Sequence, residues 1–421
     1  MLPNLTPDVD LADRLFAELR ARSFDGVGVT RDAYGPGERM AHALVKEAAE
    51  AIGLESKADP VGNLYLTLPG ADRGAKQVIL GSHLDSVPQG GNFDGAAGVL
   101  AGLAAVAGMR RAGFTPARDI TVMATRAEEA GAWFPTSYPG SRGALGMLAP
   151  DELAVRRMDN GRALADHMRE EGFDPSFVER GGRVLGPDNV AAYLEVHIEQ
   201  GPVLDAEEVP VGIVTGIPGS RRLRAARVLG EYNHSGGTPR KYRRDAAIAL
   251  AELAVALDEA WCRLDAEGRP MVCTFCTLAT TAEAGFTKIA GEARFMLDVR
   301  SVDLRNCDRL FEVLYDKVAE IEARRGVRFE LGAEGGSRPA LMDAGVQEGL
   351  RRAAGALGIP AKVMASGGGH DAGAFANAGI PSGMLFVRNQ NGSHNPHEAM
   401  RMEDFEKACA VTQRFAAEYG A

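Results

Sequence analysis

The chain has 421 residues, of which 45% are hydrophobic and 25% are charged, and its formal net charge is −10. One hydrophobic core rarely serves more than ~300 residues, so we expect two domains. The acidic balance without a basic stripe argues against a nucleic-acid partner. No run of apolar residues approaches the ~18 that a membrane span needs.

The first twenty residues predict an amphipathic helix and no signal peptide, because they lack a long apolar run and carry Asp8, Asp10, Asp13 and Glu18. A cytoplasmic location is therefore expected. The five cysteines are odd in number and scattered, which does not fit a disulfide framework. Cys273 and Cys276 form a CxxC in the strand-like stretch 271–279, where we favour a buried structural role over a redox or zinc-binding role.

Short apolar strands alternate with helical stretches in the first half of the chain. The expected elements are a strand at 77–80, a small-residue helix at 95–111, a strand at 119–125 and a strand at 191–196. This alternation predicts an α/β sheet with covering helices.

A second α/β pattern opens near Ile213 and predicts a compact inserted domain. Its expected elements are strands at 222–232, 293–301 and 328–332 and helices at 245–264 and 303–325. After Gly335 the chain returns to the first domain, with a helix at 345–357, a strand at 381–387 and a helix at 403–418.

Candidate ligands for metal ions gather just beyond the predicted strand ends. Only eight histidines occur in the chain, yet three of them lie at such positions: His83, His197 and His394. Acidic residues occupy equivalent loops: Asp94 and the adjacent pair Glu128 and Glu129. Open α/β sheets bind ligands outside the carboxyl ends of their strands, so these side chains are expected to meet at one edge.

Imidazoles with a shared carboxylate suit Zn²⁺ or Mn²⁺, and one ion alone would not need all of these ligands. The set therefore predicts a two-metal site, in which two ions lie ~3.5–4 Å apart on either side of a bridging carboxylate. We expect Asp94 to bridge. His83 and His197 would complete one site, and Glu129 and His394 the other.

Two further carboxylates are assigned supporting roles. Asp85, two residues after His83, is expected to accept a hydrogen bond from the second ring nitrogen of that ligand. Glu128 and Glu129 are adjacent and cannot point the same way, so Glu128 is expected to face the attacking water. It would act as the general base that takes the water's proton and later protonates the leaving nitrogen.

Each element also has a simpler explanation when it is taken alone. A lone HxD can be an ordinary satisfied histidine, adjacent glutamates can form a solvated face, and Asp94 can cap a helix. Their joint order at successive strand ends favours the metal site.

A set of motifs running through nearly the whole chain resembles one group of enzymes. The motifs are GSHLDSVPQGGNFDGAAGV, EE followed by GSR, EVHIEQGPVL, HSGGTPRKYRRDA, FMLDVRS, SGGGHDA and GSHNPHEAM. They resemble the dinuclear metallohydrolases that include N-carbamoyl-L-amino acid hydrolases, allantoate amidohydrolases and β-ureidopropionase. The metal ligands expected above fall on that family's metal positions.

The resemblance implies an α/β fold whose mixed-sheet catalytic domain spans residues 1–211 and 330–421, with a smaller α/β lid and dimerisation domain inserted at 212–329. It further implies a homodimer with two divalent metal ions, Zn or Mn, in each subunit. His234 matches a lid histidine that reaches the neighbouring subunit's active site. Arg300 matches an arginine that grips the substrate carboxylate, for which a planar guanidinium is suited.

Other positions match the family's substrate pocket: Gln200, Gly367, Gly368, Gly369 and His370. Taken without the family, three residues have simpler explanations: His234 as a turn residue, Arg300 as a surface partner of Asp298 or Asp303, and His370 as a helix cap.

The chain also departs from the family's pattern in places that touch the pocket or the lid. The glutamate pair is followed by an extra residue and Trp133, and Arg240 replaces a common methionine. Thr287 stands where many members carry a pocket asparagine, and Arg388 and Asn389 replace an apolar or small pair. Thr287, Arg388 and Asn389 are therefore included among the expected substrate contacts.

The expected reaction is hydrolysis of an N-carbamoyl-L-amino acid, or a close ureido acid, by a water that the metals activate. The alternatives are an aminoacylase-like or peptidase-like hydrolase of an N-acyl amide and an allantoate amidohydrolase. A non-catalytic metal-binding descendant is disfavoured, because a binding protein has no need of a proton shuttle such as Glu128.

Overall fold

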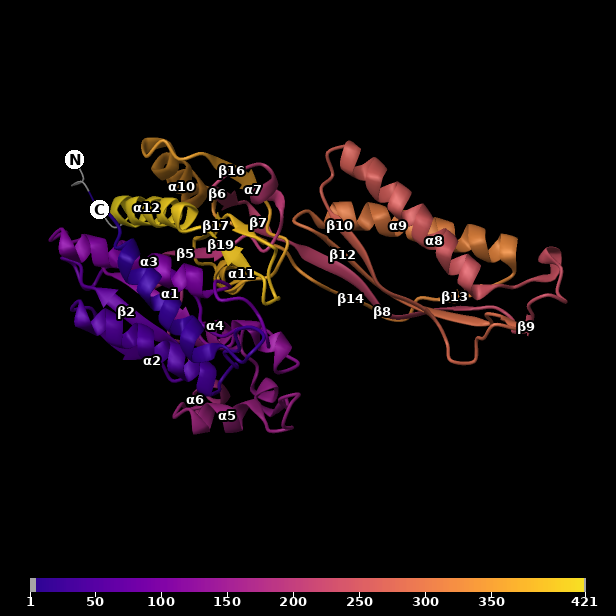
Figure 1. The fold of residues 1–421 in the computed structure, drawn as a ribbon, viewed down its shortest axis with the longest axis horizontal. Coiled ribbons are helices and arrows are strands. Elements are labelled where there is room, and N and C mark those ends of the chain that lie inside the picture. The colour runs from indigo at the N-terminus through magenta and orange to yellow at the C-terminus, as the bar shows by residue number, and fades with distance from the viewer. Residues whose placement is uncertain (1–4, 420–421) are drawn as a thin grey trace. The chain divides into compact units, whose positions relative to one another are not determined.

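The computed structural model describes residues 5–419, which form two compact units (Figure 1). The first unit comprises the chain up to Ile217 and again from Leu341 onward, and the second comprises Pro218–Ala340. The boundaries expected at 211/212 and 329/330 therefore need correction. Strand β6 (Val211–Val214) pairs within the sheet of the first unit, and β14 (Glu334–Ser337) pairs within the sheet of the second.

In the described chain, the first unit contains a mixed eight-stranded sheet. Its strands, in spatial order, are β1 (Glu55–Ala58), β2 (Leu64–Leu68), β4 (Ile120–Thr125), β3 (Gln77–His83), β5 (Val190–Ile198), β17 (Ser382–Val387), β6 and β16 (Ala361–Met364). The central strands β4, β3, β5 and β17 run parallel, while β2 and β6 are antiparallel to their inner neighbours. The prediction of a mixed α/β sheet is confirmed.

Helices cover both faces of this sheet, which is why central strands such as β4 and β17 are buried along their whole length. Successive strand residues face opposite sides. On β5, Leu194 packs in the core that includes α3 (Ala96–Arg111), whereas Tyr193 stacks on Phe375 of α11 (Asp371–Asn377) at 3.6 Å between ring centroids. The remaining helices of this unit are α1 (Val9–Ser23), α2 (Pro36–Ala51), α4 (Pro139–Ala144), α5 (Leu164–Glu170), α6 (Ser176–Glu179), α7 (Val203–Ala206), α10 (Ala344–Ala356) and α12 (Met402–Tyr419).

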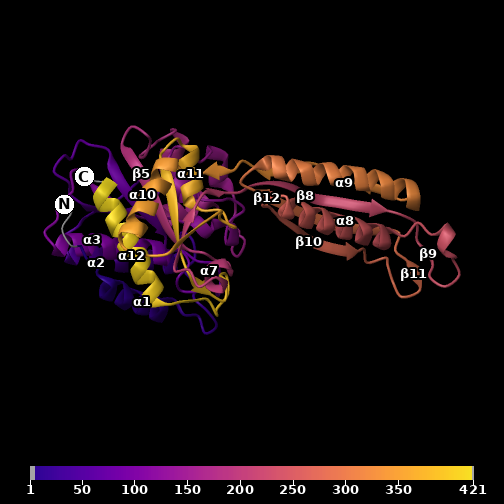
Figure 2. The same cartoon turned by 90° about the horizontal axis from the view of Figure 1, so that it is seen from above.

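Helix α3 lies unusually close to the sheet because its sequence is almost entirely small or apolar. A Cβ atom at Gly98 would lie 1.9 Å from the carbonyl oxygen of Val196, so only glycine allows this approach. Helix α12 packs beside α3, and α10 packs beside α12 (Figure 2). These contacts fix the N-terminus of α3, and with it Asp94, against the ends of the strands.

The second unit contains, in the described chain, a five-stranded antiparallel sheet with two helices on one face (Figure 1). The strands are β10 (Val272–Thr280), β12 (Glu292–Ser301), β8 (Gly219–Leu229), β13 (Arg328–Glu330) and β14. The helices α8 (Ala246–Ala266) and α9 (Leu304–Arg325) begin at Asp245 and Asp303, whose side chains accept backbone amide hydrogens. Leu253, Phe295 and Phe311 lie in the core between helices and sheet.

Short elements complete the described chain: the strands β7 (Gly216–Ile217), β9 (Asn233–His234), β11 (Lys288–Ile289), β15 (Ala340–Leu341), β18 (Asn389–Gln390) and β19 (Ala399–Met400), and the 3₁₀ helices η1 (Glu128–Ala132), η2 (Pro150–Ala154) and η3 (Arg240–Tyr242). Within residues 5–419, no helix combines the length and the apolar character that crossing a membrane requires.

The expectation of a buried CxxC is wrong for Cys276. Strand β10 is an edge strand with a register shift between Phe275 and Thr277, which leaves Cys276 exposed and Cys273 half-buried. Burial raises the pKa of the Cys273 thiol to about 12, which disfavours the thiolate that redox chemistry needs.

Candidate active site

The five predicted metal ligands lie together at the carboxyl ends of the parallel strands. His83 ends β3, Asp94 precedes α3, Glu129 lies in η1 after β4, His197 lies near the end of β5, and His394 follows β18. Their ligand atoms form two groups, His83–Asp94–His197 and Asp94–Glu129–His394, in each of which the atoms lie within 4.8 Å of one another. Asp94 belongs to both groups.

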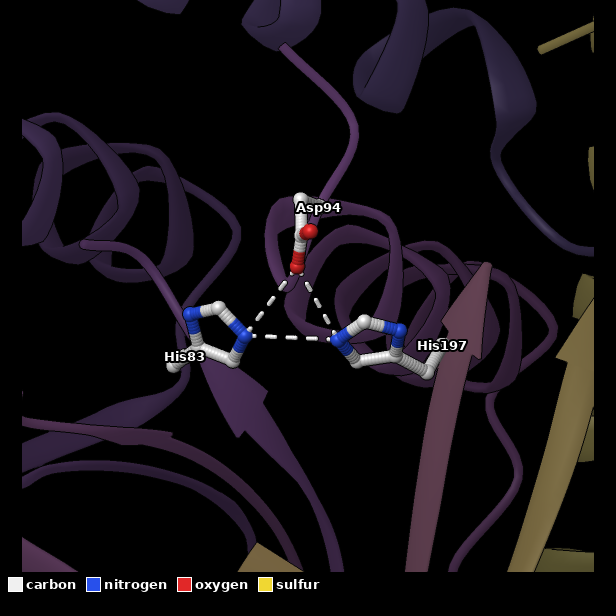
Figure 3. Close-up of side chains that lie close together, drawn as sticks. All are labelled: His83, Asp94 and His197. Atoms are coloured by element: carbon white, nitrogen blue, oxygen red, sulfur yellow. Dashed lines mark hydrogen bonds and ion pairs between the residues drawn. The ribbon is translucent and has the colours of Figure 1, made fainter. Parts of the chain in front are cut away.

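The first group is buried and presents nitrogen and oxygen atoms to a common centre (Figure 3). Asp94 Oδ1 lies 3.5 Å from His83 Nε2 and 3.2 Å from His197 Nε2. The two Nε2 atoms are 3.3 Å apart. A Cβ atom at Gly95 would lie 2.3 Å from the His83 ring, so this glycine is needed for the ligand to fit.

The tautomers of the two histidines explain why a cation fits this group. His83 Nδ1 lies 3.2 Å from the carbonyl oxygen of Asp85, and His197 Nδ1 lies 2.9 Å from that of Ile198. A ring nitrogen that faces a carbonyl carries a hydrogen, so in their neutral forms both rings would turn an Nε2 lone pair toward the common centre. Two such lone pairs beside a carboxylate suit a divalent cation such as zinc or manganese.

The second group uses the other oxygen of Asp94. His394 Nε2 lies 2.8 Å from Glu129 Oε1 and 3.4 Å from Asp94 Oδ2. Hydrogen bonds to Asp94 and Glu129 raise the pKa of His394 to about 10, which shows how strongly this pocket favours positive charge. The two oxygens of Asp94 thus face separate ligand groups, as a bridging carboxylate requires.

Three buried carboxyl groups lie close to the candidate ligands. Burial raises the pKa of Glu128, Glu195 and Asp371, and for Glu128 the neighbouring Glu129 raises it further. Ser141 and Thr125 donate hydrogen bonds to Asp371, and the amide of Ala372 donates one to Glu195. Glu128 is only 7% exposed, and this burial is the largest cause of its raised pKa.

Asp85 connects the ligand loop after β3 to the glutamate pair. Its Oδ1 and Oδ2 accept the amide hydrogens of Glu128 and Glu129 at 3.1 and 3.0 Å, and its Oδ1 lies 3.3 Å from His83 Nδ1. The sequence indicated only the histidine contact. The structure adds the two amides, through which Asp85 orients the general-base candidate as well as the ligand.

A buried glutamate on α2 holds the same turn from its other side and was missed by the sequence reasoning. Glu38 accepts the amide hydrogens of Ala127 and Tyr34 at 2.7 Å each and pairs with Arg126 at 3.1 Å. Burial raises its pKa to about 7. A charged residue on the buried face of an amphipathic helix was the available signal.

Glu398 was also missed, although it lies in the same loop as His394. It accepts the amide hydrogens of Phe93 and Asp94 at 2.8 and 3.1 Å and the hydroxyl of Ser393 at 2.6 Å. The Ser393 hydroxyl also contacts Asp94 Oδ2. Glu398 therefore ties the bridging-carboxylate loop to the His394 loop.

Several predicted pocket residues border the ligands. Gln200, in the left-handed region at φ +63°, donates to Asp94 Oδ2 at 2.9 Å. A Cβ atom at Gly368 would lie 3.2 Å from Gln200 Oε1, and one at Gly369 would lie 2.1 Å from the hydroxyl of Tyr138. The glycines thus form a thin backbone wall between these two side chains.

His370 is buried with its ring centroid 4.5 Å from that of His197. Its Nε2 lies 3.1 Å from the Ser366 hydroxyl, and its side chain makes no capping hydrogen bond to α11. Burial and the neighbouring His197 hold the pKa of His370 well below its ordinary value, so the ring is neutral.

The expected substrate roles of Arg388 and Asn389 are not supported by their contacts. Arg388 donates to Asp404 on α12 at 2.7 Å, in a mostly buried ion pair. Asn389 is buried, accepts the amide hydrogen of Gln200 at 3.0 Å and donates to the carbonyl of Gly392. Asn389 thus holds the backbone of Gln200, and Arg388 ties the end of β17 to α12.

Trp133 is likewise a packing residue. Its indole donates to the carbonyl of Ser86 at 2.9 Å, and the guanidinium of Arg157 lies 4.7 Å from the ring centroid. The extra residue in this segment is thus accommodated in a small core beside η1.

Three predicted residues belong to the second unit. His234, on β9, is exposed, and its Nδ1 accepts the amide hydrogens of Gly236 and Gly237 at 3.1 and 2.9 Å. The hydrogen of the neutral ring is therefore on Nε2, which points a donor outward. Thr287 lies beside it on the neighbouring segment, where its carbonyl accepts the amide hydrogen of Ser235. Arg300 Nη2 donates to Asp298 Oδ2 at 2.8 Å, one of the pairings that its position allowed.

Comparison with known proteins places this geometry among related chains. Residues 79–418 match the peptidase family M20/M25/M40. The chain is 36% identical to the N-carbamoyl-L-amino acid amidohydrolase of Geobacillus stearothermophilus over 390 residues, which are 91% of this chain and 90% of that one. It is 32% identical to the allantoate amidohydrolase of Escherichia coli K12 over 378 residues, which are 90% of this chain and 89% of that one. The crystal structure of a hydantoinase/carbamoylase family amidase from Burkholderia ambifaria superposes with a TM-score of 0.88 at 32% identity, covering 99% of this chain and 97% of that one.

Proposed function

Because the chain belongs to peptidase family M20/M25/M40, as an amidohydrolase of the hydantoinase/carbamoylase group that acts on non-peptide carbon–nitrogen bonds, we propose that it hydrolyses an N-carbamoyl-L-amino acid or a close ureido acid. The products are the free amino acid, carbon dioxide and ammonia, and the reaction consumes one water. The observation that carries the proposal is the shared Asp94, whose two oxygens face separate ligand groups. Glu128 is held beside them by Asp85, which contacts both the Glu128 amide and His83.

In this proposal His83, Asp94 and His197 hold one divalent ion, and Asp94, Glu129 and His394 hold the second, with Zn²⁺ or Mn²⁺ in each. When bound, such ions act as Lewis acids on the substrate carbonyl and lower the pKa of water. Glu128 takes the proton of the attacking water and delivers it to the leaving nitrogen. Burial, which raises its pKa, suits a group that must hold a proton between these two steps.

The substrate's remaining groups are assigned to the second unit. Arg300 binds the carboxylate, and His234 donates its Nε2 hydrogen to the oxyanion in the active site of a neighbouring subunit. The outward Nε2 donor of His234 supports this role.

A homodimer follows from this assignment, and strand β10 is our candidate contact. It forms one edge of its sheet, it is nine residues long without a charged side chain, and Leu278 is 50% exposed. Unprotected edges of this kind pair readily with another strand. Sedimentation of Leu278→Lys, expected to be monomeric beside a dimeric wild type, tests this contact.

Allantoate is the second candidate substrate, because a relative of 32% identity is an allantoate amidohydrolase. The test is release of ammonia by metal-loaded protein from N-carbamoyl-L-amino acids and allantoate, with N-formyl, N-acetyl and dipeptide derivatives followed by release of the free amino acid. Turnover of carbamoyl substrates with wild type but not Glu128→Gln supports the proposal. Turnover confined to allantoate or to acyl amides rejects it.

A further inference from the structure

Tyr138 has a backbone conformation that bulky residues seldom adopt. It lies in the left-handed region, at φ 53° and ψ 44°, directly before Pro139 at the start of α4. A non-glycine residue in this region is strained, and such strain persists only where the surrounding structure enforces it. The residue that follows is a proline, which further disfavours helical conformations for Tyr138.

The turn that holds Tyr138 is fixed from both sides of the active site. A Cβ atom at Gly140 would lie 2.2 Å from the carbonyl of Arg126, which precedes the glutamate pair. The hydroxyl of Ser141 donates to Asp371 at 2.5 Å, immediately after the glycine run and His370. The phenol of Tyr138 is thus held between the loop of Glu128 and the loop of Gly369.

The hydroxyl of Tyr138 has no hydrogen-bond partner among residues 5–419, although it lies against the backbone of Gly369. It also differs from the hydroxyl of Tyr193, which is sealed in the core. Tyr138 is only half-buried, so its unpaired oxygen remains open to a ligand. A phenolic oxygen that no protein group occupies can accept a hydrogen bond from a ligand.

The position of this hydroxyl identifies which end of a substrate it meets. After burial itself, Glu128 has the largest effect in raising the pKa of Tyr138. Glu128 serves the bond that is cleaved, and the turn that carries Tyr138 packs through Gly140 against Arg126, two residues before Glu128. The hydroxyl is therefore placed at the reacting end of the substrate.

We infer that the Tyr138 hydroxyl hydrogen-bonds the terminal amino group of the carbamoyl moiety and so selects carbamoyl over acetyl substrates. This inference rests on the proposed function. The two moieties have nearly the same shape, but a carbamoyl group ends in NH₂, whose hydrogens a phenolic oxygen accepts, whereas an acetyl group ends in CH₃. A site built to hydrogen-bond a group discriminates against the analogue that lacks it.

The test compares kcat/KM for the N-carbamoyl and N-acetyl derivatives of the same L-amino acid, with release of the free amino acid as the common readout. We expect Tyr138→Phe to lower the carbamoyl-to-acetyl ratio by about 10–100-fold, chiefly through the carbamoyl substrate. If turnover of the N-acetyl compound is too slow to measure, its inhibition constant as a competitive inhibitor is compared with the KM of the carbamoyl substrate in each enzyme. Tyr193→Phe is the matched control, since it removes an equally unpaired but sealed hydroxyl, and its ratio should equal that of wild type.

Melting temperature and metal content are measured alongside to show that the variant is folded and loaded. Gly369→Ala gives a second perturbation, because its methyl group would displace the Tyr138 hydroxyl and should lower the ratio in the same direction. An active wild type whose ratio is unchanged in Tyr138→Phe overturns this inference alone. A wild type that cleaves no carbamoyl substrate overturns the proposed function, and the inference with it.

Discussion

Replacing Asp85 with asparagine examines how one carboxylate organises both the ligands and the proposed base. Asp85 is fully buried and uses one oxygen for the amide of Glu128 and the other for the amide of Glu129. Asparagine has a single oxygen, so its NH₂ group must face one of these amides and leave that donor unpaired. A buried unpaired donor costs about 1–3 kcal/mol.

We therefore expect Asp85→Asn to reduce the free energy of unfolding by about 1–3 kcal/mol. Because the unpaired amide belongs to the turn that carries Glu128 and Glu129, kcat should also fall by about 10–100-fold, given that each 1.36 kcal/mol is tenfold in rate. Urea unfolding gives the stability, and ammonia release at saturating metal gives kcat.

Asp343→Asn is the matched control, since Asp343 also accepts a backbone amide, from Val346 at the start of α10, but contacts no ligand. It should change stability slightly and leave kcat and metal content as in wild type. An Asp85→Asn enzyme with wild-type kcat would refute the idea that Asp85 orients the glutamate pair.

Glu128→Gln should lower kcat by about 10²–10⁴-fold while metal content, measured by elemental analysis, stays at the wild-type level; near-normal turnover would remove Glu128 as the base. Glu398→Ala should weaken metal binding by about 10–100-fold, because the amides of Phe93 and Asp94 lose their acceptor, whereas the exposed control Glu348→Ala should bind metal normally. Arg325 and Arg324 lower the pKa of Glu252 to about 2, so the stability that Glu252 contributes is fully present above its ordinary value of 4.5 and is lost as the pH falls toward 2. The difference in unfolding free energy between wild type and Glu252→Gln should therefore shrink between pH 5 and pH 3, and a constant difference would contradict the assignment.

The convergence of the candidate metal ligands could be predicted because it depends on local features. A histidine that ends a parallel strand, such as His83 on β3, must lie at the carboxyl edge of the sheet. The same holds for His197, which lies near the end of β5. The small-residue helix after Asp94 and the apolar strand before Glu128 were equally plain in the sequence. The type of each element and the position of each residue at its end were therefore enough to predict that these side chains lie together.

The supporting residues could not be predicted, because their contacts join segments distant in the chain. Glu398 binds an amide 304 positions away at Asp94, and no local pattern encodes such a pairing. Arg388 was expected to face substrate, but its partner Asp404 becomes apparent only once α12 packs beside the loop. The domain boundaries shifted for a similar reason, since β6 and β14 are assigned by the sheets they join.

The most direct test of the two-metal hydrolase is a titration of metal-free protein with Mn²⁺ or Zn²⁺ while ammonia release from an N-carbamoyl-L-amino acid is followed. The shared Asp94 predicts no activity without metal and a rise that saturates at two ions per chain, with neither ion bound normally in Asp94→Ala. Full activity without metal, or saturation at a single ion, would contradict the account.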